Sequence, residues 1–246
     1  AMEEACGERS FCWNWREWKM KSEKNSNNKK ISYLCPNKNA LSYMAIISFK
    51  GYHGTDTESC KNILNSNYKI SQGDDHWLGD GVYFFVEGIS TKPMELAEKW
   101  AIAQSWDKNK KNHIYSDYSV LESIIKVEED KFLDLTNPIG VDFLSFLANN
   151  FKEAIKIQKR NRKKVNQKDL TYDDGALINL ARKVELFPFE VIKGNFYIKF
   201  KNERVNNINL RTSNCTICAV SAPQKNLTNT KEIKQGCNPS LCFIRD

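Results

Sequence analysis

The order of a few short elements near residues 44–104 places the strongest limit on how this chain can fold. Residues 44–52 are rich in Ile and Phe and predict a strand that ends at His53-Gly54-Thr55. Residues 57–65 place their apolar side chains on one helical face, which predicts a helix with an N-cap just before it. After a turn-rich stretch, the apolar and aromatic residues 82–86 predict a short buried strand.

The remaining elements continue this alternation of helices and strands. Pro93 suits the first turn of a helix that Ala97, Trp100 and Ala101 continue at helical spacing. Further strands are predicted at residues 120–135, 187–200 and 214–220, and further helices at residues 141–157 and 176–184. We therefore expect a mixed α+β domain with two packed sheets and peripheral helices.

Composition places a domain boundary near residue 43. Phe11, Trp15 and Trp18 have helical spacing and predict a short amphipathic element, and the polar residues 21–30 predict a linker. We expect residues 1–43 to form a Trp-rich appendage and linker, and residues 44–246 to form the main domain. The opening Ala1-Met2 resembles an expression-vector remnant, so part of the appendage is expected not to be native.

The overall composition is that of a globular chain that needs no membrane. Its 246 residues are 41% hydrophobic and 11% aromatic, which is enough to bury a sizeable core. No apolar run approaches the roughly 20 residues of a membrane span, and the first 30 residues lack the apolar core of a signal peptide. These features predict a cytoplasmic protein.

The eight cysteines are expected to be reduced thiols in such a chain. Cys215 and Cys218 have the CxxC spacing of a zinc site, but no second CxxC or CxxH follows them. We therefore expect unpaired core cysteines and no metal.

Positive charge is concentrated in one segment, although the net charge of +7 is modest. Eight of the seventeen residues 152–168 are Lys or Arg, most densely at Lys159–Lys164. This pattern is typical of a solvated helix face that runs into a loop, and it also fits a surface that contacts nucleic-acid phosphates.

Two motifs together carry a family resemblance. The first motif is His53-Gly54-Thr55, which contains one of only three histidines in the chain. A predicted helix that carries Ile63-Leu64 follows it, and after this helix comes the second motif, Leu78-Gly79-Asp80-Gly81-Val82-Tyr83-Phe84. This order resembles the ADP-ribosyltransferases of the histidine-tyrosine class, which include diphtheria-toxin-like and poly-ADP-ribose-polymerase-like enzymes. The resemblance is close over residues 49–101 and rests elsewhere on the succession of strands.

The resemblance implies a split mixed β-sheet core, NAD as co-substrate and a role for each matching residue. His53 would bind ribose hydroxyls through a neutral imidazole, with Thr55 adding a hydroxyl. The backbone of Gly54 would approach the nicotinamide carboxamide, because no side chain obstructs it. Tyr83 would lie against the positively charged nicotinamide ring. Trp100 would cover the other face of that ring, or would instead anchor its helix in the core.

A catalytic carboxylate is the element of the family that has no clear counterpart. Such enzymes commonly carry a Glu near the start of a late strand, but residues 213–220 contain no carboxylate. The matching position falls on Cys215 or Thr216, depending on register. Glu203 in the preceding loop, or more distantly Glu190, would be the substitute.

The resemblance thus implies a mono-ADP-ribosyltransferase that cleaves NAD and modifies a protein or a nucleic acid, in the manner of a toxin or defence effector. The alternative is a catalytically degenerate module that binds NAD or ADP-ribose. A third alternative, an RNA enzyme that removes phosphate, would need several arginines around its pocket, and arginine is sparse between residues 44 and 110.

Overall fold

A computed structural model of the chain describes residues 20–22, 31–33, 45–73, 76–150, 174–183, 187–200 and 212–242. The chain divides into two units, residues 1–43 and 44–246. In the first unit, β1 (Met20–Ser22) pairs antiparallel with β2 (Ile31–Tyr33). The amphipathic element predicted from Phe11, Trp15 and Trp18 lies outside the described residues.

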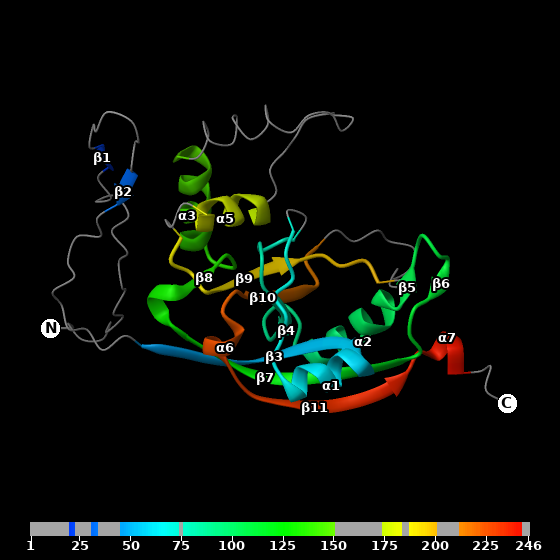
Figure 1. Cartoon of the computed structure of the whole chain (residues 1–246). Coiled ribbons are helices and arrows are strands. Elements are labelled where there is room, and N and C mark those ends of the chain that lie inside the picture. Colours follow the sequence, from blue (N-terminus) through cyan, green and yellow to red (C-terminus); the bar gives the residue numbers. More distant parts are fainter. Residues whose placement is uncertain are drawn as a thin grey trace, which may run out of the picture. The chain divides into compact units, whose positions relative to one another are not determined.

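A seven-stranded mixed sheet organises the second unit (Figure 1). The strand order is β11-β7-β3-β4-β10-β9-β8, and all neighbours pair antiparallel except β8 and β9, which are parallel. Within the described residues this is one continuous sheet rather than the two packed sheets that we predicted. Its strands are β3 (Ile46–Asp56), β4 (Val82–Val86), β7 (Asp117–Glu128), β8 (Phe132–Asp134), β9 (Val191–Phe196), β10 (Cys215–Val220) and β11 (Leu227–Cys237).

The sheet is only weakly joined at its middle. β3 pairs with β7 along its whole length, but it pairs with β4 at two residues alone, Gly51 with Val86 and Tyr52 with Phe85. Beyond Tyr52 the two strands are no longer paired. In Figure 1, β3, β7 and β11 run side by side below β9 and β10. The sheet therefore opens next to His53, one of the residues that the motifs single out.

Helices accompany this sheet, and the first of them begins at a side-chain N-cap. At the first helix, the Asp56 carboxylate accepts a hydrogen bond from the Ser59 backbone N–H at 2.8 Å, as expected of an N-cap. The helices are α1 (Thr57–Asn65), α2 (Pro93–Gln104), α3 (Pro138–Asn150), α5 (Asp174–Lys183), α6 (Pro223–Asn226) and α7 (Pro239–Cys242), and a small hairpin joins β5 (Trp106–Asp107) to β6 (Asn112–His113).

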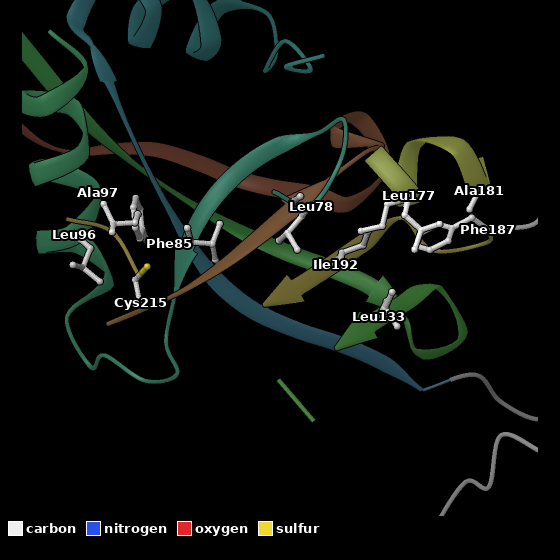
Figure 2. Close-up of a cluster of buried hydrophobic side chains, with 14 of the residues drawn as sticks. Leu78, Phe85, Leu96, Ala97, Leu133, Leu177, Ala181, Phe187, Ile192 and Cys215 are labelled. Carbon is white, nitrogen blue, oxygen red and sulfur yellow. The ribbon is translucent and has the colours of Figure 1, made fainter. Parts of the chain in front are cut away.

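Buried side chains form two clusters, and β10 contributes to both because successive strand residues point to opposite faces. Cys215, Ile217 and Ala219 belong to one cluster, whereas Cys218 and Val220 belong to the other. Figure 2 shows much of the first cluster, in which side chains from α2 and α5 meet those of the sheet. Both faces of this strand are therefore packed.

Several predicted boundaries are wrong for identifiable reasons. The first strand continues past His53 to Asp56, because β7 supplies partners along all of it. Residues 120–135 are two strands rather than one, since a 3-10 turn at Glu129–Lys131 interrupts them. β11 was not predicted at all, because this edge strand alternates polar residues with few apolar ones. The helix predicted at residues 141–157 is described only to Asn150.

The cysteines only partly follow the prediction. Cys60, Cys215 and Cys218 are free and buried, as expected of core thiols. Cys237, in contrast, is disulfide-bonded, so the expectation of reduced thiols is wrong for this residue. Sequence spacing could not reveal it, because pairing depends on the distance between two Cα atoms in the fold. Within the described ranges, His, Cys, Asp and Glu side chains form no cluster of three that could hold a metal, and no helix is long and apolar enough to cross a membrane.

Candidate functional site

A cavity of about 450 Å³ lies where β3 and β4 separate. Side chains and backbone from β3, β4, α2 and the turn before β4 line it. Of the residues that the motifs predicted, His53, Gly54, Tyr83 and Trp100 all line this cavity. The fold thus brings together two motifs that lie thirty residues apart in the sequence.

The His53 imidazole is held in one orientation and one tautomer. Its Nδ1 lies 2.8 Å from the backbone carbonyl oxygen of Tyr83. Because a carbonyl can only accept, Nδ1 carries the proton and Nε2 is left as an acceptor. Burial lowers the pKa of His53, and the hydrogen bond to Tyr83 offsets this only in part. The side chain is therefore a neutral acceptor at physiological pH.

Gly54 is required by packing as well as by its place in the cavity. A Cβ added there would lie 1.9 Å from the carbonyl oxygen of Ala97, which belongs to the backbone of α2. We predicted that Gly54 lacks a side chain so that a ligand can approach its backbone. The structure adds a second reason, since only glycine lets α2 lie this close to β3.

Tyr83 lines the cavity and packs on the first core cluster, and its hydroxyl bonds to the neighbouring turn. The hydroxyl donates to the carbonyl oxygen of Gly79 at 2.6 Å and accepts from the backbone N–H of Leu78 at 2.9 Å. Burial raises the pKa of Tyr83 to about 12, so the hydroxyl stays protonated and can do both. The ring centroid lies 5.7 Å from that of His76. Both hydrogen bonds of the hydroxyl are thus made within the protein.

Aromatic side chains form one wall of the cavity. Trp77 stacks on Phe196 with ring centroids 5.0 Å apart and an interplanar angle of 19°. Trp100 meets both Trp77 and Phe85 edge-on, each at 6.4 Å. Trp77 is 38% exposed, and Trp100 packs on the first core cluster while it lines the cavity. Trp100 therefore packs in the core, and its contact with a ligand stays a prediction.

The two β10 residues at the expected carboxylate position are buried away from the cavity. Thr216 donates to the side-chain oxygen of Asn195 at 2.8 Å and accepts from the backbone N–H of Ile89 at 2.9 Å. Cys215 donates to the Phe196 carbonyl oxygen at 3.3 Å, and burial raises the pKa of its thiol to about 11. Ile217 is the β10 residue that lines the cavity. The contact of β10 with the cavity is therefore apolar, and neither Cys215 nor Thr216 is among the residues that line it.

The other predicted residues lie elsewhere or are not described. Thr55 donates to the Asp56 carboxylate at 3.3 Å and is not among the residues that line the cavity. The Glu190 carboxylate contacts the Lys225 ammonium at 2.8 Å, also outside the cavity. Glu203 and the basic segment Lys159–Lys164 fall outside the described residues. Among the described residues, none that lines the cavity carries a carboxylate.

Several cavity residues were not predicted. Lys69, Ser71 and Gln104 line the cavity, and the Ser71 hydroxyl lies 2.8 Å from Nε2 of His76. Backbone hydrogen bonds in both directions between Ser71 and Gly81 bring this stretch beside β4. A turn-rich sequence indicates a loop but does not show which side chains point inward. The sequence therefore contains no signal that identifies these residues as part of the cavity.

Comparison with known proteins gives a partial match without a known activity. No protein-family model matches the chain. An uncharacterized protein of Methanocaldococcus jannaschii is 36% identical over 95 residues, which are 38% of this chain and 40% of that protein. The match therefore spans less than half of either protein, and it assigns no function.

The first prediction concerns the Tyr83 hydroxyl. Tyr83→Phe removes the partner of two backbone groups at Leu78 and Gly79, of which Leu78 is fully buried. We expect the free energy of unfolding to fall by about 1–3 kcal/mol. Chemical denaturation measures it, with Tyr197→Phe at an exposed tyrosine as the control. Equal stability of the two variants would contradict a structural role for this hydroxyl.

The second prediction concerns pH. Because burial lowers the pKa of His53 in the folded protein, the unfolded chain binds this proton more tightly, with a pKa of about 6.5. The free energy of unfolding should therefore decrease as the pH falls below about 6.5, by up to about 1.4 kcal/mol per pH unit from this group. The decrease should end once the pH passes the lowered pKa.

His53→Asn is the matched control for this titration, because it removes the ionisable group but keeps an N–H donor near the position of Nδ1. Stability should be measured by denaturation at a series of pH values. A parent and a variant with the same dependence between pH 4 and 7 would show that His53 is not the titrating group.

Proposed function

We propose that this chain binds NAD in the cavity between β3 and β4 and transfers a single ADP-ribose to a macromolecular acceptor. One observation carries the proposal. His53 and Tyr83 line the same cavity, and the hydrogen bond between them leaves Nε2 of His53 as a neutral acceptor. The resemblance to the histidine-tyrosine class of ADP-ribosyltransferases implies that these two residues share a site.

The described residues suit the chemical parts of NAD. The cavity volume of about 450 Å³ falls in the range of roughly 300–1,000 Å³ that is usual for small-molecule sites. Nε2 of His53 can accept a hydrogen bond from a ribose hydroxyl. Tyr83 and Trp100 offer aromatic faces to the positively charged nicotinamide ring. Lys69 adds a positive charge for the diphosphate.

The proposed reaction exchanges one bond at the ribose for another. The bond between ribose carbon and nicotinamide nitrogen breaks through an oxocarbenium-like state, and a nucleophilic atom of the acceptor forms the new bond while its proton passes to solvent. In this scheme His53 binds the substrate and Tyr83 holds the ring that leaves. A carboxylate that stabilises the developing charge would come from Glu203, or its task would fall to Thr216, Cys215 or the acceptor. The acceptor is a protein or a nucleic acid.

A second candidate function is a module that binds NAD or ADP-ribose without cleaving it. The composition of the cavity lining favours this module. Among the described residues the lining contains no carboxylate, and β10 contributes the apolar Ile217 to it. Binding needs only the His53 acceptor and the aromatic faces, whereas cleavage gains from a nearby negative charge. Both candidate functions place NAD in the same cavity, but only the enzyme would cleave it.

The third prediction tests the NAD site. His53→Asn keeps a donor for the Tyr83 carbonyl but lacks the Nε2 acceptor, so we expect NAD to bind roughly three- to tenfold more weakly at pH 8. Calorimetric titration measures the dissociation constant, with Tyr197→Phe as the control. Unchanged affinity in a folded His53→Asn protein would remove His53 from the site, and failure of the parent to bind NAD would end the proposal.

The fourth prediction separates enzyme from binding module. For an enzyme that depends on Glu203, Glu203→Gln should retain NAD binding and release nicotinamide at least tenfold more slowly, because the charge matters chiefly as the ribose becomes positive. Thr216→Val and Cys215→Ser test the alternative source in β10. Nicotinamide release should be followed by chromatography after incubation with cell lysate as the acceptor.

The rates of nicotinamide release by the parent and the three variants identify the source of the negative charge. Slow release by Glu203→Gln alone assigns the role to Glu203, whereas slow release only by the β10 variants assigns it to that strand. A parent that binds NAD and releases no nicotinamide with any acceptor supports the binding module instead. Isotopically labelled NAD then shows whether a protein or a nucleic acid receives the label.

A further inference from the structure

Helix α5 holds the turn that precedes β4, although the two lie about a hundred residues apart in the sequence. The side chain of Asn179 on α5 accepts from the Asp80 backbone N–H at 2.7 Å. Its amide nitrogen donates to the Asp80 carboxylate at 2.9 Å and to the Gly73 carbonyl oxygen at 3.3 Å. One asparagine thus binds the backbone and the side chain of the same turn residue.

Arg182, one helical turn further along α5, makes a third contact with the same residue. Its Nη1 donates to the Asp80 carbonyl oxygen at 2.7 Å, and its guanidinium lies 5.5 Å from the ring centroid of Phe187. The other edge of the guanidinium, Nε and Nη2, is buried and has no hydrogen-bond partner among the described residues. Buried donors without partners destabilise a fold, so stability alone does not account for an arginine here.

The turn and the helix approach each other too closely for the turn to shift freely. A Cβ at Gly175 of α5 would lie 1.5 Å from the His76 carbonyl oxygen, and a Cβ at Gly79 would lie 2.6 Å from Oδ1 of Asn179. Gly79 also has φ +73°, a left-handed conformation that favours glycine. Leu78 lies in the same buried cluster as Leu177 and Ala181 of α5 (Figure 2).

The residues that flank this turn, Trp77 and Gly81, line the cavity. The Tyr83 hydroxyl bonds to the Leu78 N–H and the Gly79 carbonyl, while α5 bonds to both backbone groups of the next residue, Asp80. Trp77, which precedes this pair, lines the cavity. Three consecutive residues of the turn are therefore held between α5 on one side and Tyr83 on the other.

We propose that Asn179 and Arg182 are positioning residues that fix the 78–80 turn and thereby set the positions of the Tyr83 ring and of Trp77 in the cavity. Neither side chain lines the cavity, so both act through the turn. Their effect on NAD affinity rests on the proposed function. Their effect on the turn does not, and the two effects are measured separately.

Amide hydrogen exchange, followed by NMR, tests the effect on the turn without any ligand. In Asn179→Ala the Asp80 amide loses its acceptor directly, and we expect protection of the Leu78 amide, which bonds to Tyr83, to fall at least tenfold as well. Lys183→Met, at the exposed end of the same helix, is the control and should leave both amides protected. Loss of protection at Asp80 alone, with Leu78 unchanged, would overturn the proposal.

Arg182 variants test the effect on the cavity and guard against loss of folding in Asn179→Ala. Arg182→Met removes the donor to the Asp80 carbonyl and should weaken NAD binding roughly tenfold. The melting temperature should change little, because the variant also removes two buried donors that have no partner among the described residues. Arg182→Lys keeps one donor for the Asp80 carbonyl and should restore binding. A lower melting temperature with unchanged NAD affinity would make Arg182 a stability residue and refute the positioning role.

The two readouts also separate this inference from the proposed function. If the parent binds no NAD, the proposed function fails, while exchange at Leu78 in Asn179→Ala still decides the positioning role. If the parent binds NAD and neither Arg182→Met nor Asn179→Ala changes its affinity, the proposed function stands and the positioning role fails.

Discussion

The hydrogen bond between Nδ1 of His53 and the Tyr83 carbonyl oxygen is the interaction on which the arrangement of the cavity depends. β3 and β4 share only two residue pairs, and they separate beyond Tyr52. The imidazole crosses this gap and joins the two strands where backbone pairing has ended. Because the acceptor is a carbonyl, the same contact fixes the tautomer and leaves Nε2 for a ligand. Strand separation, which would otherwise only weaken the sheet, thus creates a cavity with a defined acceptor.

The cavity residues also have structural roles, so packing and binding constrain the same positions. Gly54 lets α2 lie against β3, and Tyr83 ties its hydroxyl to the turn before its own strand. Trp100 packs on the core and reaches the cavity with the same ring. A substitution at any of these positions would alter both stability and the shape of the site. Measurements of binding therefore need a stability control, and His53→Asn is useful because it separates the donor from the acceptor.

The sequence predicted the elements whose signals are local. Residues 57–65 and 82–86 form the helix and strand expected of them, because a capped apolar face and a short aromatic run specify these structures without help from the rest of the chain. β11 was not predicted, since its stability comes from pairing with β7 rather than from its own residues. The contacts of Asn179 with Asp80 could not be predicted either, because they join segments that are far apart in the chain. His53 and Tyr83 could be grouped only because a resemblance related their two motifs.

The register of β10 decides which strand residues can take part in chemistry. Ile217 lines the cavity, and Cys215, on the same face, is buried where its thiol stays protonated. Thr216 points to the other face, where Asn195 and the backbone of Ile89 occupy its hydroxyl. A shift of one residue would turn Thr216 toward the cavity but would also exchange the buried sets on both faces of the strand, so packing opposes it. This register favours a negative charge from outside β10, and Glu203 or the acceptor itself is therefore the group to test first.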